Sequence, residues 1–402
     1  MEHFELSKLS TDRDRLTKVL RAFTEMQTKI AFMVARDDLL KLFASNDDRK
    51  YTTATTVSYL TYICEYLGES DRCYFKPDEL SKVISTLSMP SERKGFAVPS
   101  YAQPLGWDDN LMDKSIKASD GADMDPQQLK NALSYLLRPD LSKTTQGDYF
   151  GVIFRGDEMI TTTGQLMLIQ NGLPVVTTEP RLLGYDAAVA LYSILRTPFV
   201  SEVQMGVAKK SGIFGVRVEI DDGSEMFFWS KPKYHPIDDY KDPRPAVDPR
   251  SVGFVVHGPF LESVLTGTMQ AVTDKERPVV TLKTTNTGLQ YTSYGADEKY
   301  LSPARPIYQG EIPMTRSMQN QEEVTICARA DNLIQAVKGL GDSAQFIIPF
   351  HPLLGFQVHT IDPFYINCNQ SQFALIAPYV LDREQVIPLE KLKRKANNAM
   401  EP

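Results

Sequence analysis

The stretch Asp125–Leu137, with the sequence DPQQLKNALSYLL, contains the pattern on which the prediction of the fold depends. A spacing of i, i+3, i+4, i+7 and i+8 separates its apolar residues, Leu129, Ala132, Leu133, Leu136 and Leu137. This spacing is typical of a short amphipathic helix with a single buried stripe. Asp125 suits the N-cap and Pro126 suits the first helical position, so we predict a helix that begins directly after Asp125.

The same apolar spacing recurs along the chain in a regular order. Two further helices of the same kind are predicted at Leu16–Phe23 and Leu261–Met269. Each of the three is followed by a second short helix, at Leu80–Leu87, Ala187–Leu195 and Leu333–Leu340. An aspartate stands at the N-cap or in the first turn of each second helix, at Asp78, Asp186 and Asp331. Six matches in this order indicate an internal repeat.

Strand-like runs lie between and after these helices. They alternate β-branched and aromatic residues, as in Lys29–Ala35, Tyr149–Phe154, Phe214–Ile220, Met226–Trp229, Val279–Lys283, Gly288–Ser293 and Phe373–Ala377. The chain therefore predicts an α+β fold of three tandem domains, each with two short helices on antiparallel sheet. We place them at residues 1–124, 125–248 and 249–381, followed by a basic tail at 382–402. The first domain is divergent, because Met89–Met124 is short and rich in Pro, Ser, Asp and Gly.

The repeat has a geometric consequence. Two helices that bury their apolar stripes on one face of a sheet leave their polar faces exposed together. Three such units in line present a row of helices on one side and sheet on the other. If two chains close head to tail, the sheets form an outer wall and the helices line a hole.

Composition narrows the class of protein. The chain has 402 residues, 42% of them hydrophobic and 24% charged, which is typical of a globular protein. Its apolar runs are too short for a membrane span, and Met1–Glu5 lacks the features of a signal peptide. Four scattered cysteines fit a reducing compartment, so we expect a cytoplasmic protein without a membrane partner. The net charge of −7 argues against a generally basic surface but allows a basic lining on one face.

Basic residues on or after the predicted helices are candidates for sequence-independent contacts with DNA phosphates. They are Arg15, Lys18, Arg21, Lys130, Arg138, Lys143, Arg196, Lys209, Lys210, Lys275 and Lys338. The alternative is that they form ordinary solvated helix faces. The helix at Leu261–Met269 fits the first interpretation poorly, because it carries Glu262 and no base.

Catalytic motifs are missing from the sequence. It has no Gly-rich phosphate loop ending in Gly-Lys-Ser/Thr and no GxSxG motif, and its histidines are far apart. We therefore expect a protein that is not an enzyme and that has no cofactor and no metal. The acid pairs Asp221-Asp222 and Asp238-Asp239 leave open a hydrolase or nuclease as the alternative from another class, although both pairs stand in turn-like settings.

Three motifs occur in the order and spacing of a known family. Phe227–Lys231, reading FFWSK, runs into His235–Tyr240, reading HPIDDY; the other two are Ile160–Met167 and Phe373–Leu381. With these motifs, the stretch Asp125–Leu381 resembles domains two and three of bacterial sliding clamps, the DNA polymerase III β subunit family. The resemblance implies a homodimeric ring around double-stranded DNA, a processivity factor for DNA polymerase. The divergence of the first domain would suit a bacteriophage version.

The resemblance also implies particular sites. A hydrophobic pocket between the second and third domains would receive short linear peptides from DNA polymerase and the clamp loader. Its residues would be Tyr149, Thr162, Gly164, Leu166, Met167, Pro236, Leu375, Ala377, Pro378 and Tyr379. DNA-backbone contacts are implied near Lys143 and Gln146. The alternative for the pocket positions is that they are core residues of two adjoining domains.

Two departures from the family pattern affect these expectations. Gln165-Leu166 stands where the family has a His-Arg pair, so the polar contacts of the pocket would differ. The tail 382–402, with the basic run Lys391–Lys395, extends beyond the point where the family ends. The alternative function within the same fold is a clamp-like structural ring without DNA in its hole, for example in a virion.

Overall fold

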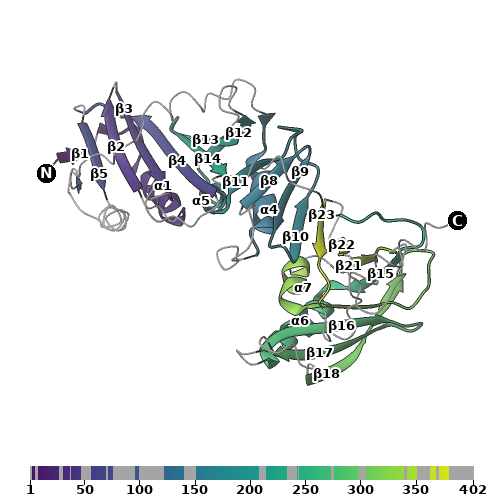
Figure 1. Cartoon of the computed structure of the whole chain (residues 1–402). Helices are drawn as coiled ribbons and strands as arrows, with labels where there is room; N and C mark the ends of the chain where they lie inside the picture. The colour runs from purple at the N-terminus through teal and green to yellow at the C-terminus, as the bar shows by residue number, and fades with distance from the viewer. Residues whose placement is uncertain are drawn as a thin grey trace. The chain divides into compact units, whose positions relative to one another are not determined.

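The computed structural model describes residues 2–4, 8–26, 30–36, 38–46, 56–68, 71–75, 96–98, 122–139, 151–207, 214–232, 242, 244–272, 276–297, 305–338, 342–350, 363–367 and 371–379 (Figure 1). The chain divides into two compact units. Unit 1 comprises Met1–Thr161 and Gln170–Tyr240, and unit 2 comprises Thr162–Ile169 and Lys241–Pro402. The first two predicted domains fall almost entirely within unit 1. This division into two units does not test the boundaries of the three predicted domains, which stay a prediction.

The helices match the apolar pattern of the sequence. Unit 1 contains α1 (Arg13–Glu25), α4 (Pro126–Leu136) and α5 (Tyr185–Leu195), and unit 2 contains α6 (Gly258–Ala271) and α7 (Ala330–Val337). Five of the six predicted helices are thus confirmed, and the one at Leu80–Leu87 lies outside the described residues. Asp125 caps α4 as predicted, because its carboxylate accepts hydrogen bonds from the backbone N–H groups of Gln127 and Gln128. None of the helices among the described residues is long and apolar enough to cross a membrane.

An eight-stranded antiparallel sheet forms much of unit 1. Its order is β5-β2-β3-β4-β14-β13-β12-β7. The strands are β2 (Ile30–Arg36), β3 (Leu39–Ser45), β4 (Thr56–Glu65), β5 (Asp71–Phe75), β7 (Ala122–Asp123), β12 (Val200–Val207), β13 (Phe214–Ile220) and β14 (Glu225–Pro232). Strict alternation of buried and half-buried residues along β13 reflects a strand with one face on the core.

Unit 1 has two further groups of strands. One has the order β11-β8-β9 and is formed by β8 (Gly151–Arg155), β9 (Glu158–Thr162) and β11 (Arg181–Gly184). The other is the pair of β1 (Glu2–Phe4) with β6 (Phe96–Val98). Helix α5 packs against strands of both larger groups, namely β4 and β14 of the first and β8 and β11 of the second.

Unit 2 has two antiparallel groups of strands. The first has the order β10-β23-β22-β21-β15-β19, with β10 (Leu166–Gln170), β15 (Val252–His257), β19 (Met314–Arg316), β21 (Ser343–Ile348), β22 (Phe364–Asn367) and β23 (Gln372–Ile376). The second has the order β18-β17-β16-β20, with β16 (Glu276–Thr284), β17 (Leu289–Asp297), β18 (Arg305–Ile312) and β20 (Thr325–Arg329). Helices α6 and α7 pack against each other and against β16.

The order of elements along the chain repeats as the sequence predicts. In the second repeat, β7 and α4 precede four strands, then α5 and the strands β12, β13 and β14. The third repeat has the same order from β15 to β23, with β19 as an additional short strand. The first repeat begins in the same way with β1, α1 and four strands. This arrangement confirms the predicted α+β class, with few helices on antiparallel sheets.

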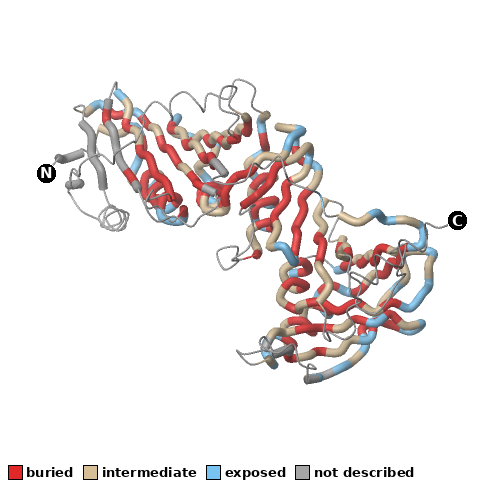
Figure 2. Tube along the Cα trace, viewed as in Figure 1, coloured by how far each residue is buried: buried red, intermediate tan, exposed pale blue. Residues whose placement is uncertain are grey.

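The buried residues follow the strands and the helix stripes of each unit (Figure 2). Phe23, Tyr62 and Phe228 are among the largest fully buried side chains of unit 1. In unit 2, the rings of Phe254 and Phe346 stack with their centroids 5.0 Å apart. Aromatic side chains of this size bury much apolar surface, so each unit has a core of its own.

The first and second repeats share one sheet in unit 1. Strand β4 of the first repeat pairs with β14 of the second, in a register that places Tyr59 opposite Trp229. These two rings stack with centroids 4.0 Å apart. Next to them, the backbone N–H of Gly184 donates a 2.7 Å hydrogen bond to the hydroxyl of Ser230. The sheet therefore continues from the first repeat into the second through the β4–β14 pair, and the stacked rings add a side-chain contact across this junction.

Candidate functional site

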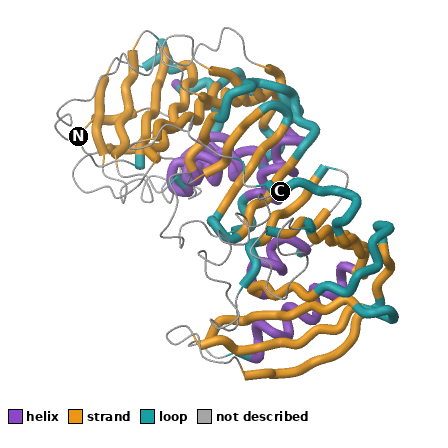
Figure 3. Tube along the Cα trace, turned by 45° about the vertical axis from the view of Figure 1, so that its right-hand side comes forward, coloured by secondary structure: helices purple, strands orange, loops and turns teal. Residues whose placement is uncertain are grey.

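The helices of unit 1 carry four cations that have no carboxylate partner among the described residues. Helix α1 packs against α5, and α5 packs against α4, so the three helices form a contiguous group (Figure 3). Lys18 and Arg21 lie on α1, Lys130 lies on α4, and Arg196 is the C-cap of α5. Within the described part of the chain, none of the four forms an ion pair. Arg196 lies over the ring of Tyr192, 5.8 Å from its centre, which does not neutralise its charge. Cations without a carboxylate partner on one group of helices are suited to sequence-independent phosphate contacts.

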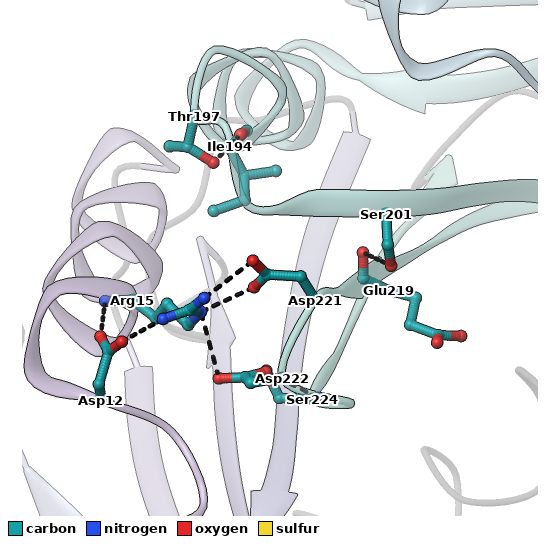
Figure 4. Close-up of polar contacts among 9 residues, drawn as sticks. All are labelled: Asp12, Arg15, Ile194, Thr197, Ser201, Glu219, Asp221, Asp222 and Ser224. Atoms are coloured by element: carbon teal, nitrogen blue, oxygen red, sulfur yellow. Dashed lines mark hydrogen bonds and ion pairs between the residues drawn. The ribbon is translucent and has the colours of Figure 1, made fainter.

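Two other predicted DNA contacts in unit 1 are engaged with their own chain. The guanidinium of Arg15 donates to the carboxylate of Asp221 with Nε–Oδ1 2.7 Å and Nη2–Oδ2 2.8 Å (Figure 4). It also lies 4.8 Å from the centre of the Phe199 ring. Arg138 lies over the ring of Tyr135 at 4.8 Å. Arg15 is therefore a structural cation in this fold, and a phosphate would have to compete with Asp221 for it.

The helices of unit 2 carry fewer basic residues than those of unit 1. Helix α6 carries Glu262 and no base, as noted from the sequence, and the structure adds that the ring of Phe260 is exposed. Lys338, at the C-cap of α7, is exposed. Five predicted DNA contacts, Lys143, Gln146, Lys209, Lys210 and Lys275, lie outside the described residues. Among the described helices, the free cations are thus concentrated in unit 1.

The eight described residues of the predicted peptide pocket all belong to unit 2 and come from two distant segments. Tyr149 and Pro236 lie outside the described residues. The backbone N–H of Ala377 donates a 2.8 Å hydrogen bond to the carbonyl of Gln165, which joins the turn before β10 to the segment after β23. The N–H of Tyr379 in turn donates to the carbonyl of Cys327 at 2.7 Å. The tertiary structure therefore brings the two predicted halves of the site together.

Burial divides these residues into two groups. Leu166, Met167 and Leu375 are at most 4% exposed and belong to the core of unit 2. Accessible surface comes from the others, Thr162, Gly164, Ala377, Pro378 and Tyr379. For Leu166, Met167 and Leu375, the alternative that they are core residues therefore fits. Only the five accessible residues can contact a partner directly.

The turn at Thr162–Leu166 has a defined geometry. Gly164 has a φ of +83°, a conformation that favours glycine. Its N–H donates to the hydroxyl of Thr162 at 3.1 Å, and the N–H of Thr163 donates to the carbonyl of Leu166 at 2.9 Å. These bonds hold Gln165 in an exposed position, where its Oε1 accepts a 3.3 Å hydrogen bond from Arg329. Arg329 is also paired with Asp331, so the polar edge of this site is an Arg–Asp–Gln group.

Of the two acid pairs noted in the sequence, Asp221-Asp222 is described by the structure, and both of its side chains have structural roles. Asp221 binds Arg15, and Oδ1 of Asp222 accepts from the N–H and the hydroxyl of Ser224 at 2.9 Å and 2.6 Å. The hydrogen bond from Arg15 lowers the pKa of Asp221, against the opposing effect of burial. Asp238 and Asp239 lie outside the described residues. No group of three or more His, Cys, Asp or Glu side chains that could hold a metal ion occurs among the described residues.

The structure of this chain is similar to those of solved bacterial DNA polymerase III β subunits. The subunit from Pseudomonas aeruginosa has a TM-score of 0.61 and 13% identity, over 94% of this chain and 100% of that chain. The chain has the sliding-clamp fold. Caulobacter crescentus pol III beta gives a TM-score of 0.64 and 13% identity, over 92% of this chain and 99% of that chain. A Pseudomonas aeruginosa sliding clamp bound to griselimycin has a TM-score of 0.60 and 12% identity, over 94% of this chain and 99% of that chain.

The likeness to sliding clamps is one of structure. No protein-family model matches the sequence, and no curated protein matches it either. At 12–13% identity the comparison establishes the fold, and the site residues depend on the geometry of this chain.

Some contacts of this sliding-clamp fold were not predicted from the sequence. Arg329 joins Gln165 to Asp331 at the polar edge of the candidate peptide site, although 164 residues separate Arg329 from Gln165. Phe199 contacts Arg15 across a comparable separation. No spacing rule connects positions so far apart, so only the assembled fold reveals these contacts.

Proposed function

We propose that this protein is a sliding clamp, a DNA polymerase processivity factor that encircles double-stranded DNA and performs no chemistry of its own. Two copies would close head to tail into a ring in the cytosol of a bacterial or phage-infected cell. The observation that carries the proposal is the way in which successive repeats are joined through their strands.

The same strand junction occurs in both units. In unit 1, β4 pairs with β14. Strand β4 is the third strand after the first helix of repeat one, and β14 is the last strand of repeat two. In unit 2, the corresponding strand of repeat two, β10, neighbours the last strand of repeat three, β23. The corresponding strand of repeat three, β18, lies at the end of its sheet with no second partner among the described strands. An open edge of this kind pairs readily with another chain, so we infer that β18 pairs with a strand of repeat one in a second copy.

The charge pattern supports the DNA part of the proposal. Lys18, Arg21, Lys130 and Arg196 would contact phosphates without reading bases, so binding should be insensitive to sequence and sensitive to salt. A ring threaded by DNA would stay bound through topology, and a few loose contacts would allow it to slide. The chain would need an external ATP-driven loader, because its sequence has no nucleotide-binding motif.

Partner proteins would bind the surface around Thr162, Gly164, Ala377, Pro378 and Tyr379. Apolar and methyl-bearing groups there are suited to anchoring the apolar side chains of a short linear peptide from polymerase or clamp loader. The polar edge formed by Gln165 and Arg329 would orient the peptide through hydrogen bonds. Binding of a ligand to a clamp has a parallel in the Pseudomonas aeruginosa structure with griselimycin.

A topological test distinguishes this function from its alternatives. Light scattering should give a mass of about twice the 45.2 kDa chain. Loaded protein should remain on nicked circular DNA and leave when the circle is linearised. A stable monomer, or a complex that is indifferent to linearisation, would contradict the closed ring.

A clamp-like structural ring without DNA is the second candidate. It is favoured by helix α6, which carries no base and exposes Phe260. A dimer of the expected mass that fails to stay on nicked circles, even at low salt and with a loader present, would favour this candidate.

A further inference from the structure

The candidate peptide site lies where the described part of the chain ends. Its accessible residues are Thr162, Gly164, Ala377, Pro378 and Tyr379, and Tyr379 is the last described residue. The backbone N–H of Ala377 donates to the carbonyl of Gln165 at 2.8 Å, and that of Tyr379 donates to the carbonyl of Cys327 at 2.7 Å. The residues that follow Tyr379 therefore start on the site itself, from a point that is held by the backbone.

The surface around Tyr379 is aromatic. The side chains of Tyr294 and Tyr379 pack against the buried pair Val279 and Cys327, and both are only partly buried. Aromatic side chains held in this way provide a large contact area at a low cost in conformational entropy. A segment with aliphatic side chains would therefore find an apolar surface here, next to the polar edge that contains Arg329.

The sequence after Tyr379 contains such a segment. Residues 380–402 lie outside the described residues. Within them, Glu384–Leu389 reads EQVIPL, with three large aliphatic side chains, one acid and no base, and the basic run Lys391–Lys395 follows it. A proline disfavours the helical conformation for the residue before it and favours an extended one, so Pro388 lowers the entropy that this segment would lose on binding in an extended form.

We propose that Glu384–Leu389 binds the candidate peptide site of its own chain and competes there with partner peptides. This inference rests on the proposed function of that site. The aliphatic side chains of the segment would cover the accessible apolar surface around Tyr379, which is favourable because it removes apolar area from water. Glu384 and Gln385 would face the polar edge, where Arg329 can donate hydrogen bonds to them.

The tether is short enough to make the competition effective. The five Cα–Cα steps from Tyr379 to Glu384 span at most about 18 Å, and a reversal of the chain needs only a four-residue turn. A short flexible linker gives an effective concentration of about 1 mM, so a segment with a Kd of about 0.1 mM would lower the affinity for a free peptide about tenfold. A partner protein would have to displace the segment, and the site would be partly inhibited until it does.

Fluorescence anisotropy with the full chain tests this inference. The probe is a fluorescein-labelled peptide with the sequence of residues 383–392, REQVIPLEKL. It should bind the double variant Ile387→Asp/Leu389→Asp about tenfold more tightly than the wild type, because the altered segment no longer competes. Ala396→Asp/Ala399→Asp is the matched control: it adds the same charges to the tail outside the segment and should bind the probe as the wild type does.

A third variant separates the site from its occupant. Gly164→Ala, added to Ile387→Asp/Leu389→Asp, should weaken binding of the probe about tenfold if the probe occupies the candidate peptide site. Equal affinity of the wild type and the Ile387→Asp/Leu389→Asp variant, with this dependence on Gly164 intact, would overturn the inference and leave the site standing. Binding that does not depend on Gly164, or no binding to the Ile387→Asp/Leu389→Asp variant, would also overturn it, and retention on nicked circular DNA would still test the ring separately.

Photochemical cross-linking gives an independent measurement. With Val386 replaced by p-benzoylphenylalanine, irradiation should join the segment to peptides that contain Gly164 or Tyr379 of the same chain, at a yield independent of protein concentration. A cross-link that forms only between two chains would assign the segment to a second copy and overturn the inference.

Discussion

Arg15 and Asp221 form a two-point ion pair between the first and second repeats, although 206 residues separate them in the chain. Asp12, the N-cap of α1, accepts from the same guanidinium, so Arg15 links the start of α1 to the β13–β14 turn. A planar guanidinium matches a carboxylate at two points and fixes its orientation. This pair, together with the β4–β14 strand pairing, makes the junction between the two repeats a defined structure.

Breaking the pair should destabilise unit 1 without weakening DNA binding. We expect Arg15→Gln to lower the Tm by about 2 °C, because it removes both hydrogen bonds to Asp221. Asp221→Asn should lower it similarly, and the double variant should be no worse than either single one. Arg21→Gln is the matched control: it should leave the Tm unchanged and reduce DNA affinity. Additive decreases in the double variant would show that the two side chains do not interact.

The same pair should make stability depend on pH. The hydrogen bond from Arg15 lowers the pKa of Asp221 below its value in the unfolded chain. A lowered folded-state pKa gives stability that is fully present above the unfolded-state pKa of about 3.9. This contribution should disappear as the pH falls through the lower folded-state pKa. Tm measured from about pH 5 to pH 2 should therefore fall more steeply in the wild type than in Asp221→Asn; equal slopes would contradict the assignment.

Removing the free cations of unit 1 should reduce the salt dependence of DNA binding. Removal of a single phosphate contact should lower the slope of log K against log salt by about 0.9. We expect this for Arg21→Ala and for Lys130→Ala, with equal effects on DNA of different sequences. Lys283→Ala is the control, because Lys283 is similarly exposed but lies 3.7 Å from Glu323. A reduced slope in the control alone would place the DNA on another surface.

The turn at Gly164 should control partner binding. Gly164 has a φ of +83°, and an added Cβ would meet no other atom within 4 Å, so Gly164→Ala strains the backbone without a clash. We expect affinity for a partner peptide, measured by fluorescence anisotropy, to fall about tenfold. Gly223→Ala introduces the same strain at a φ of +82° in unit 1 and should leave this affinity unchanged. Equal decreases in both variants would point to a general effect on folding.

Two cysteines should resist alkylation in the native protein. Burial raises the pKa of both Cys64 and Cys327 to about 12. Because the thiolate is the reactive form, iodoacetamide at pH 8 should leave both unmodified until the protein unfolds. Peptide mass spectrometry with and without denaturant measures this directly. Rapid labelling of Cys327 under native conditions would show that the contact between Cys327 and Tyr379 opens frequently.

Local patterns in the sequence predicted the elements well. The helix that follows Asp125 begins where its N-cap and its proline place it, because capping depends only on neighbouring residues. The apolar stripes of α1, α5, α6 and α7 were equally readable, since helical periodicity is a local property. The order of these elements was sufficient to predict three repeats and the α+β class.

The roles of individual side chains depended on the tertiary structure. Nothing near Arg15 in the sequence distinguishes it from Lys18 and Arg21, yet the fold places a carboxylate 2.7 Å from Arg15 and leaves the other two unpaired among the described residues. Likewise, Leu166 and Ala377 were predicted as equivalent pocket residues, and only packing separates the buried one from the accessible one. The sequence by itself determined the repeat and the capped helices, because these depend on short-range geometry. The tertiary structure decided which charges are neutralised and which apolar groups are covered, because both depend on residues that meet only after folding.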